Sequence, residues 1–140
     1  MPVFATPVWL QAYKDAINAS PEIAEAAQDW DGRDIAIVVL ADVAKNVPMD
    51  LAAVFEIDHG TCREARIVSH EEADRATFTI TAPYLLWKDV VLGKLDPIRG
   101  MLQGKLQVSG DLPTLAREVQ AAKALVNLAS SVTSSFPDEE

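Results

Sequence analysis

Consecutive segments with the two-residue period of a β-strand constrain this chain most strongly. Residues 51–58 (LAAVFEID), 62–68 (CREARIV) and 76–82 (ATFTITA) each alternate apolar and polar side chains, a pattern typical of strands with one buried face. Residues 59–61 (HGT) between the first two have turn chemistry. Residues 35–43 (IAIVVLADV) are apolar apart from Asp42, which is typical of a strand buried on both faces. We therefore predict an antiparallel meander with one apolar and one polar face.

Helical periodicity flanks these segments on both sides. Ser20 and Pro21 have the N-cap and first-turn pattern that begins a second helix, and Asp31-Gly32 would end it. Pro83 stops the sheet and begins a strongly apolar helix. We expect helices over residues 7–17, 21–30, 83–93, 97–102 and 111–132, and a late strand over 105–110.

The last predicted helix is the longest. Over residues 111–132 it would measure ~33 Å, whereas a five-stranded sheet is only ~19–25 Å wide. One end would therefore overhang the sheet. The overhanging residues, 127–136, are rich in Ser and Thr, which have low helix propensity. We hypothesise that they form a mobile flap over the mouth of a pocket.

Length and charge limit the class of protein. A chain of 140 residues predicts one domain, which we place at residues 1–136, followed by an acidic tail at 137–140. A net charge of −9 disfavours nucleic acid as a partner. No apolar run approaches the ~20 residues that span a bilayer, and the N-terminus lacks the pattern of a signal peptide. The single cysteine, Cys62, cannot form an internal disulfide, so we expect a cytoplasmic protein.

The Gly-Lys pairs do not have the spacing of a phosphate-binding loop. Such a loop needs four residues between its first glycine and Gly-Lys, and then Ser or Thr. Here the pair at 104–105 lies three intervening residues after Gly100 and is followed by leucine. We therefore assign Gly93, Gly104 and Gly110 to helix ends and close turns.

Nucleophilic and metal-ligating residues are few. His59 and Cys62 have a tolerable ligand spacing, but His70 is expected at the opposite end of the hairpin, ~20 Å away. Cys62 lacks a positioned base, and we expect the carboxylates at 71–74 and 138–140 to be solvated. We predict a protein that is not an enzyme, with no cofactor and no metal site.

The C-terminal half carries an excess of apolar side chains. Seven of them fall within residues 85–95, and more follow at 98–108 and along the last helix. They could fill an ordinary core, or they could line a cavity between the helices and the apolar face of the sheet. Periodicity does not separate these two arrangements.

The order of motifs over residues 83–129 resembles the sterol carrier protein 2 (SCP2-type) lipid-binding family. The resemblance rests on Trp87, then GKLD at 93–96, a short helix, GKLQVSGD at 104–111 and a leucine-striped terminal helix. It implies a single α/β (α+β) domain with a five-stranded, mainly antiparallel sheet and helices over one face. It also implies an apolar tunnel that binds and transfers fatty acids, acyl-CoA esters or sterols without catalysis. Placed by face, the predicted tunnel residues are Trp87, Val91, Ile98, Met101, Leu102, Leu106, Leu115, Val119 and Val126.

Other classes of function stay open on the sequence. The domain could be a structural or regulatory module with a filled core that pairs with itself or with an enzyme. Its acidic surface could bind a basic partner. A thioester hydrolase with one long helix on a sheet fits less well, because that class places the long helix early and here it comes last.

Overall fold

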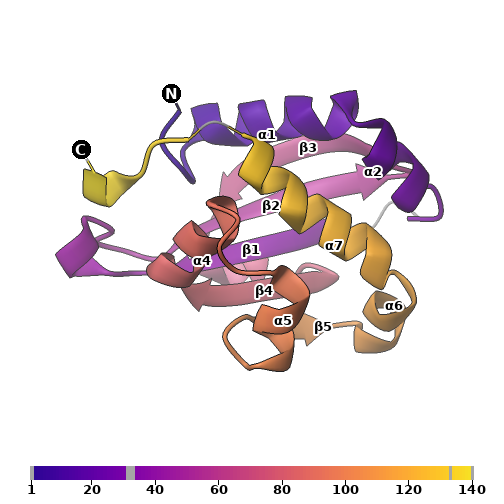
Figure 1. Cartoon of the computed structure of the whole chain (residues 1–140). Coiled ribbons are helices and arrows are strands. Elements are labelled where there is room, and N and C mark those ends of the chain that lie inside the picture. Colours follow the sequence, from indigo (N-terminus) through magenta and orange to yellow (C-terminus); the bar gives the residue numbers. More distant parts are fainter. Residues whose placement is uncertain (1, 31–33, 133, 140) are drawn as a thin grey trace.

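The computed structural model describes residues 2–30, 34–132 and 134–139. In these residues a five-stranded sheet has the strand order β3-β2-β1-β4-β5 (Figure 1). The strands are β1 (Asp34–Leu40), β2 (Leu51–Asp58), β3 (Thr61–Val68), β4 (Phe78–Pro83) and β5 (Gln107–Gly110). All neighbours pair antiparallel except β1 and β4, which are parallel. The predicted five-stranded, mainly antiparallel sheet of a single domain is confirmed.

The predicted meander holds only for the first three strands. β4 does not pair with β3 but with the other edge of β1, where Ile35 lies opposite Phe78. The chain makes this crossover through the short helix α3 (His70–Ala73), which packs against β1 and β2. A parallel pair needs such a crossover because a tight hairpin cannot connect two strands that run in the same direction. The alternating pattern of β4 was read correctly, and its place in the sheet was not.

Two apolar layers cover the two faces of the sheet. The larger core lies between one face and the helices α1 (Pro7–Ala19), α4 (Tyr84–Val91), α5 (Pro97–Leu102) and α7 (Val119–Leu128), which Figure 1 shows in front of the strands. A smaller cluster on the opposite face joins Ala73 of α3 to Ala36 and Val38 of β1. β1 is therefore buried on both faces, as its continuous apolar sequence predicted.

The N-terminal helices begin at the prolines that the sequence indicates. The Thr6 side chain caps α1, and the Ser20 hydroxyl accepts a hydrogen bond from the Ile23 amide at the start of α2 (Pro21–Ala26). α2 ends earlier than expected, although Trp30 is fully buried and its carbonyl accepts from the His59 amide. The end predicted at Asp31-Gly32 lies outside the described residues.

The last helix is not the continuous rod that was predicted. It consists of α6 (Leu112–Arg117), α7 and the 3-10 turn η2 (Ala129–Ser131), with a break at Glu118, whose backbone leaves helical geometry (φ −109°, ψ 25°). The break lets α6 turn away (Figure 1), so that α7 alone lays its buried residues over the sheet. The length argument for an overhang was therefore wrong. Mobility of residues 127–136 stays a prediction.

The C-terminal segment packs onto the domain instead of extending into solvent. Ser135 forms a parallel bridge with Val3, and the Phe136 side chain is 2% exposed. The turn η3 (Pro137–Glu139) follows. Asp138 accepts a hydrogen bond from the Tyr84 hydroxyl at 2.5 Å. The expectation that the charge at Asp138 is solvated is therefore wrong.

One further 3-10 turn, η1 (Val43–Lys45), lies between β1 and β2.

Candidate functional site

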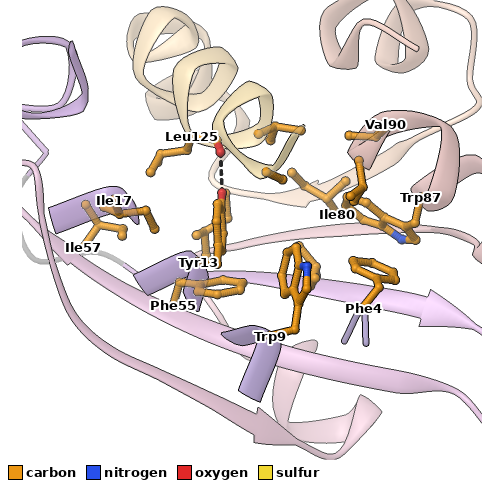
Figure 2. Close-up of a pocket in the computed structure, with 15 residues that line it drawn as sticks. Phe4, Trp9, Tyr13, Ile17, Phe55, Ile57, Ile80, Trp87, Val90 and Leu125 are labelled. Atoms are coloured by element: carbon orange, nitrogen blue, oxygen red, sulfur yellow. Dashed lines mark hydrogen bonds between the residues drawn. The ribbon is translucent and has the colours of Figure 1, made fainter. Parts of the chain in front are cut away.

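An apolar cavity lies between the inner face of the sheet and helices α1, α4 and α7 (Figure 2). Its volume is about 40 Å³, enough for a few water molecules at ~10–15 Å³ each but well below the ~300–1,000 Å³ of typical ligand pockets. Its lining residues are Phe4, Trp9, Tyr13, Ile17, Ile35, Ile37, Phe55, Ile57, Ile80, Trp87, Val90, Val91, Leu125, Val126 and Ala129.

Local geometry explains why these residues converge. Trp9, Tyr13 and Ile17 are four residues apart on α1, a spacing that places them on one face of a helix. Phe55 and Ile57 share one face of β2 because side chains alternate along a strand. The apolar stripe of α1 therefore meets the apolar face of the sheet. Leu125 and Val126 of α7 complete the wall of the cavity.

Aromatic rings form one wall of the cavity. The rings of Trp9 and Tyr13 are stacked with centroids 5.2 Å apart, and Phe55 meets Tyr13 edge-on at 5.2 Å. Phe4 contacts Trp9 edge-on at 5.0 Å. These arrangements are the favoured ones for aromatic pairs, so this wall is well packed.

The polar atoms of the wall are hydrogen-bonded to the protein. The indole N–H of Trp9 donates to Ser134 Oγ at 2.7 Å, and that of Trp87 donates to the Val38 carbonyl at 2.9 Å. The Tyr13 hydroxyl donates to the Leu125 carbonyl. Burial, followed by the proximity of Cys62, raises the pKa of Tyr13, so its hydroxyl is neutral at physiological pH. Among the described residues no charged side chain lines the cavity, and the surface offered to a ligand is hydrocarbon.

The predicted tunnel residues fall into four groups. Trp87, Val91 and Val126 line the cavity. Leu106 is buried in the same core, and Ile98 and Met101 are partly buried, but these three are not among the lining residues. Leu102 is 84% exposed and Val119 is 37% exposed, so both lie away from the cavity. The side chain of Leu115 lies outside the described residues.

Sequence reasoning missed the half of the cavity that the N-terminal part of the chain supplies. A helix over residues 7–17 and an apolar face over residues 51–58 were predicted, but none of their residues was placed among the predicted tunnel residues. These lining residues could have been found from two patterns taken together: an aromatic stripe on the first helix and an apolar face on the sheet. Both surfaces must be buried, and the last helix can cover them together.

The other chemical candidates do not form a site in the described part of the chain. His59 pairs with Asp58 at 2.7 Å and His70 with Asp50 at 3.0 Å, and no group of three metal-ligating side chains occurs among the described residues. Burial raises the pKa of the Cys62 thiol to about 11. A thiol with this pKa is a poor nucleophile at neutral pH, because the thiolate is the reactive form.

The glycines of the two Gly-Lys pairs have structural roles. Gly93 and Gly104 have positive φ angles (77° and 74°) where α4 and α5 end. A Cβ atom on Gly110 would lie 2.0 Å from the Thr77 carbonyl oxygen, so only glycine fits between β4 and β5. The predicted role at helix ends is confirmed for Gly93 and Gly104, whereas Gly110 is the last residue of β5 and permits a close approach to β4.

Comparison with known proteins gives a consistent result. The model of the SCP-2 sterol transfer family matches residues 10–123. A crystal structure of sterol carrier protein 2 is 34% identical, with a TM-score of 0.84 over 93% of this chain and 99% of its own. A conserved hypothetical protein of Thermus thermophilus, described as possibly a sterol carrier protein, is also 34% identical (TM-score 0.82; 94% and 91% of the two chains). Sterol carrier protein 2 of Yarrowia lipolytica in its apo form shares the fold at 16% identity (TM-score 0.56; 92% and 94%).

A search of curated proteins finds no match. Among the described residues, no helix has both the length and the apolar character needed to cross a bilayer.

Proposed function

The chain belongs to the SCP-2 sterol transfer family, and from this membership we propose that it binds a hydrophobic lipid between its sheet and helices and transfers it without chemical change. The candidate ligands are a fatty acid, a fatty acyl-CoA or a sterol. The observation that carries the proposal is the cavity itself: fifteen side chains, none of them charged, surround a space that they do not fill. They come from the sheet, from three helices, from the segment before α1 and from η2.

Lipid binding requires the cavity to widen, because about 40 Å³ is far smaller than a lipid chain. α7 is the wall best suited to move. It packs against α1, α2, α4 and α5, but no strand pairing holds it, and its C-terminal end passes into the 3-10 turn η2. An outward shift of α7 would enlarge the space without breaking the sheet.

The energetics of such binding are favourable. Each buried methylene contributes about 0.8 kcal/mol, so ten of them contribute roughly 8 kcal/mol. Loss of ligand freedom and ordering of side chains costs several kcal/mol. Micromolar affinity therefore needs no charged anchor, which agrees with the uncharged wall.

The proposal is tested by two measurements on freshly purified protein. Native mass spectrometry should detect co-purified lipid, and a fluorescent lipid should bind saturably. Val126→Phe should weaken that binding about tenfold or more, because Val126 lines the cavity and a larger side chain occupies ligand space. Val119→Phe is the matched control on the same helix, and we expect it to leave binding unchanged because Val119 is 37% exposed and outside the lining. Equal effects of the two changes, or no binding at all, would refute the proposal.

The alternative is a structural or regulatory module with an essentially filled core that pairs with itself or with an enzyme. The small volume of the cavity favours it. The same experiment separates the lipid carrier from the filled module. A filled module carries no lipid, and Val126→Phe would change only its stability.

We further propose that the protein is not an enzyme and that it resides in the cytoplasm. The first is supported by the chemistry of the cavity wall, where no described residue carries a reactive side chain. The second is supported by the free, buried thiol of Cys62, which a reducing compartment preserves.

A further inference from the structure

We propose that Tyr84 and Lys88 form an anion-binding site outside the cavity, which Asp138 of the same chain occupies in this structure, and that a phosphate or carboxylate that displaces Asp138 releases residues 134–139 from the end of the cavity. We call these residues the C-terminal strap. The anion site stands independently of lipid binding, whereas the effect of its occupation on the cavity rests on the proposed function.

Two hydrogen-bond donors converge on one carboxylate at this site. The Tyr84 hydroxyl donates to Asp138 Oδ1 at 2.5 Å, and the Lys88 Nζ atom donates to Oδ1 and Oδ2 at 3.1 and 3.0 Å. Tyr84 and Lys88 are four residues apart on α4, so they lie on one face of the helix, and neither lines the cavity. Tyr84 is fully buried and the Lys88 side chain is 14% exposed. A hydroxyl and an ammonium around both oxygens of a carboxylate have the chemistry of an oxyanion site.

The environment of Lys88 requires an anion. Burial by itself lowers the pKa of Lys88, but the contacts with Asp138 and Glu139 outweigh burial and raise it. Its Nζ atom lies 3.2 Å from Glu139 Oε2 and 5.1 Å from the centre of the Phe136 ring. Removing one partner of a shielded ion pair leaves a charge without compensation, which is strongly unfavourable. Asp138 therefore leaves most readily when another anion takes its place.

The strap that carries Asp138 also packs against residues that line the cavity. Ser134 Oγ accepts a hydrogen bond from the indole N–H of Trp9 at 2.7 Å, and the Phe136 ring lies 6.1 Å from the ring of Phe4. Phe4 and Trp9 both line the cavity, and Figure 2 shows them with Trp87 at one end of it. Release of the strap would uncover this end.

The remaining described contacts of the strap lie outside the five-stranded sheet. The Phe4 amide donates to the Ser135 carbonyl at 2.9 Å, and the Ser135 amide donates to the Pro2 carbonyl at 3.0 Å. The Asn46 side chain donates to the Pro137 carbonyl at 3.1 Å. The strap can therefore leave without breaking a strand pairing. Hydrogen exchange at the Phe4 and Ser135 amides reports this release directly.

An external anion has to compete with an anion of the same chain. A tethered group acts at an effective concentration that is about millimolar for a short linker. Inorganic phosphate reaches such a concentration in solution, and anionic phospholipids reach it on a membrane surface. The two sources present the same oxyanion to Tyr84 and Lys88, so the experiment has one arm for each.

The first arm is an NMR titration with sodium phosphate, compared with sodium chloride at equal ionic strength. We expect saturable shifts of the Tyr84 and Lys88 amides, together with an increase of about threefold or more in hydrogen exchange at Phe4 and Ser135 as the strap opens. In Asp138→Asn the phosphate concentration at half-saturation should fall about fivefold or more, because the apparent affinity rises with the fraction of molecules whose site is open.

Lys88→Met should abolish saturation by phosphate, because it removes the ammonium while keeping the length of the side chain. Lys105→Met is the matched control. It removes an exposed lysine from the second Gly-Lys pair and should leave phosphate binding unchanged. Equal phosphate binding by Lys88→Met and Lys105→Met would show adventitious binding only and would overturn the proposal, as would an unchanged half-saturation in Asp138→Asn.

The second arm replaces phosphate with vesicles of phosphatidylcholine, with or without phosphatidylglycerol. Faster exchange at Phe4 and Ser135 with phosphatidylglycerol alone would assign the site to a membrane lipid, and faster exchange with inorganic phosphate alone would assign it to a soluble anion. No change with either overturns the proposal. Phosphate should also speed the uptake of a fluorescent lipid. If no lipid probe binds at all, the proposed function and the role of the strap in uptake fail together, whereas phosphate binding that depends on Lys88 would still establish the anion site.

Discussion

The Nζ atom of Lys88 lies 3.0 Å from a carboxylate oxygen of Asp138, so a residue of helix α4 is tied to the C-terminal turn η3. Both side chains are only 14% exposed, and Lys88 also lies 5.1 Å from the centre of the Phe136 ring. The hydrogen bond from the Tyr84 hydroxyl, followed by the contact with Lys88, holds the pKa of Asp138 below its usual value. We call the contacts of Asp138 with Tyr84 and Lys88 the C-terminal clasp. The clasp holds the C-terminal segment beside α4, the helix whose Trp87 and Val91 line the cavity.

Replacing Asp138 should therefore destabilise the protein. We expect Asp138→Asn to lower the free energy of unfolding by about 1–2 kcal/mol, because it removes a charge-assisted contact that is shielded from water. Glu71→Gln is the control, since Glu71 pairs with Arg75 while both side chains are more than 70% exposed, and exposed pairs contribute little. Chemical denaturation at pH 7 measures the free energy of unfolding of both variants. Equal decreases in the two variants would contradict a stabilising role of the clasp.

The same variant predicts a pH dependence. The folded-state pKa of Asp138 is depressed, so its contribution is complete above the unfolded pKa of ~3.9 and is lost as the pH falls through the folded value. The difference in stability between wild type and Asp138→Asn should be constant from about pH 5 to 7 and should shrink below about pH 4. A difference that grows on acidification would show that another group dominates.

Two glycines with positive φ angles should respond differently to alanine. Gly110→Ala should cost about 3 kcal/mol or more, because the new Cβ atom would lie 2.0 Å from the Thr77 carbonyl oxygen and the backbone is strained for an alanine. Gly104→Ala meets no atom within 4 Å and should cost only about 1 kcal/mol. Denaturation midpoints compare them, and similar losses would mean that conformational strain alone sets the cost at Gly110.

Tryptophan fluorescence should report lipid binding through two of the three indoles. Trp9 and Trp87 line the cavity, whereas Trp30 packs edge-on against Phe78 elsewhere in the core. A lipid-induced change in emission should persist in Trp30→Phe and disappear in the double variant Trp9→Phe/Trp87→Phe. Loss of the change in Trp30→Phe would place the ligand outside this cavity.

The sequence predicts most of the local structure of this chain. Period-two patterns located β2 to β5 and a continuous apolar run located β1. Pro7 and the Ser20-Pro21 pair marked the starts of α1 and α2, and the glycines marked positions that require positive φ angles. These features depend on a residue and its near neighbours. The ordered motifs from Trp87 to Asp111 also indicated the family.

The tertiary structure alone decided the features that depend on distant segments. β4 pairs with β1 and not with β3, the last helix breaks at Glu118, and Asp138 returns to Tyr84 and Lys88. Periodicity tells which face of an element is apolar, but a cavity is the difference between the volume that several elements enclose and the volume of the side chains they contribute. Trp87, Val91 and Val126 meet Trp9 and Tyr13 around such a space, while Leu102 and Val119, equally apolar in sequence, face outward.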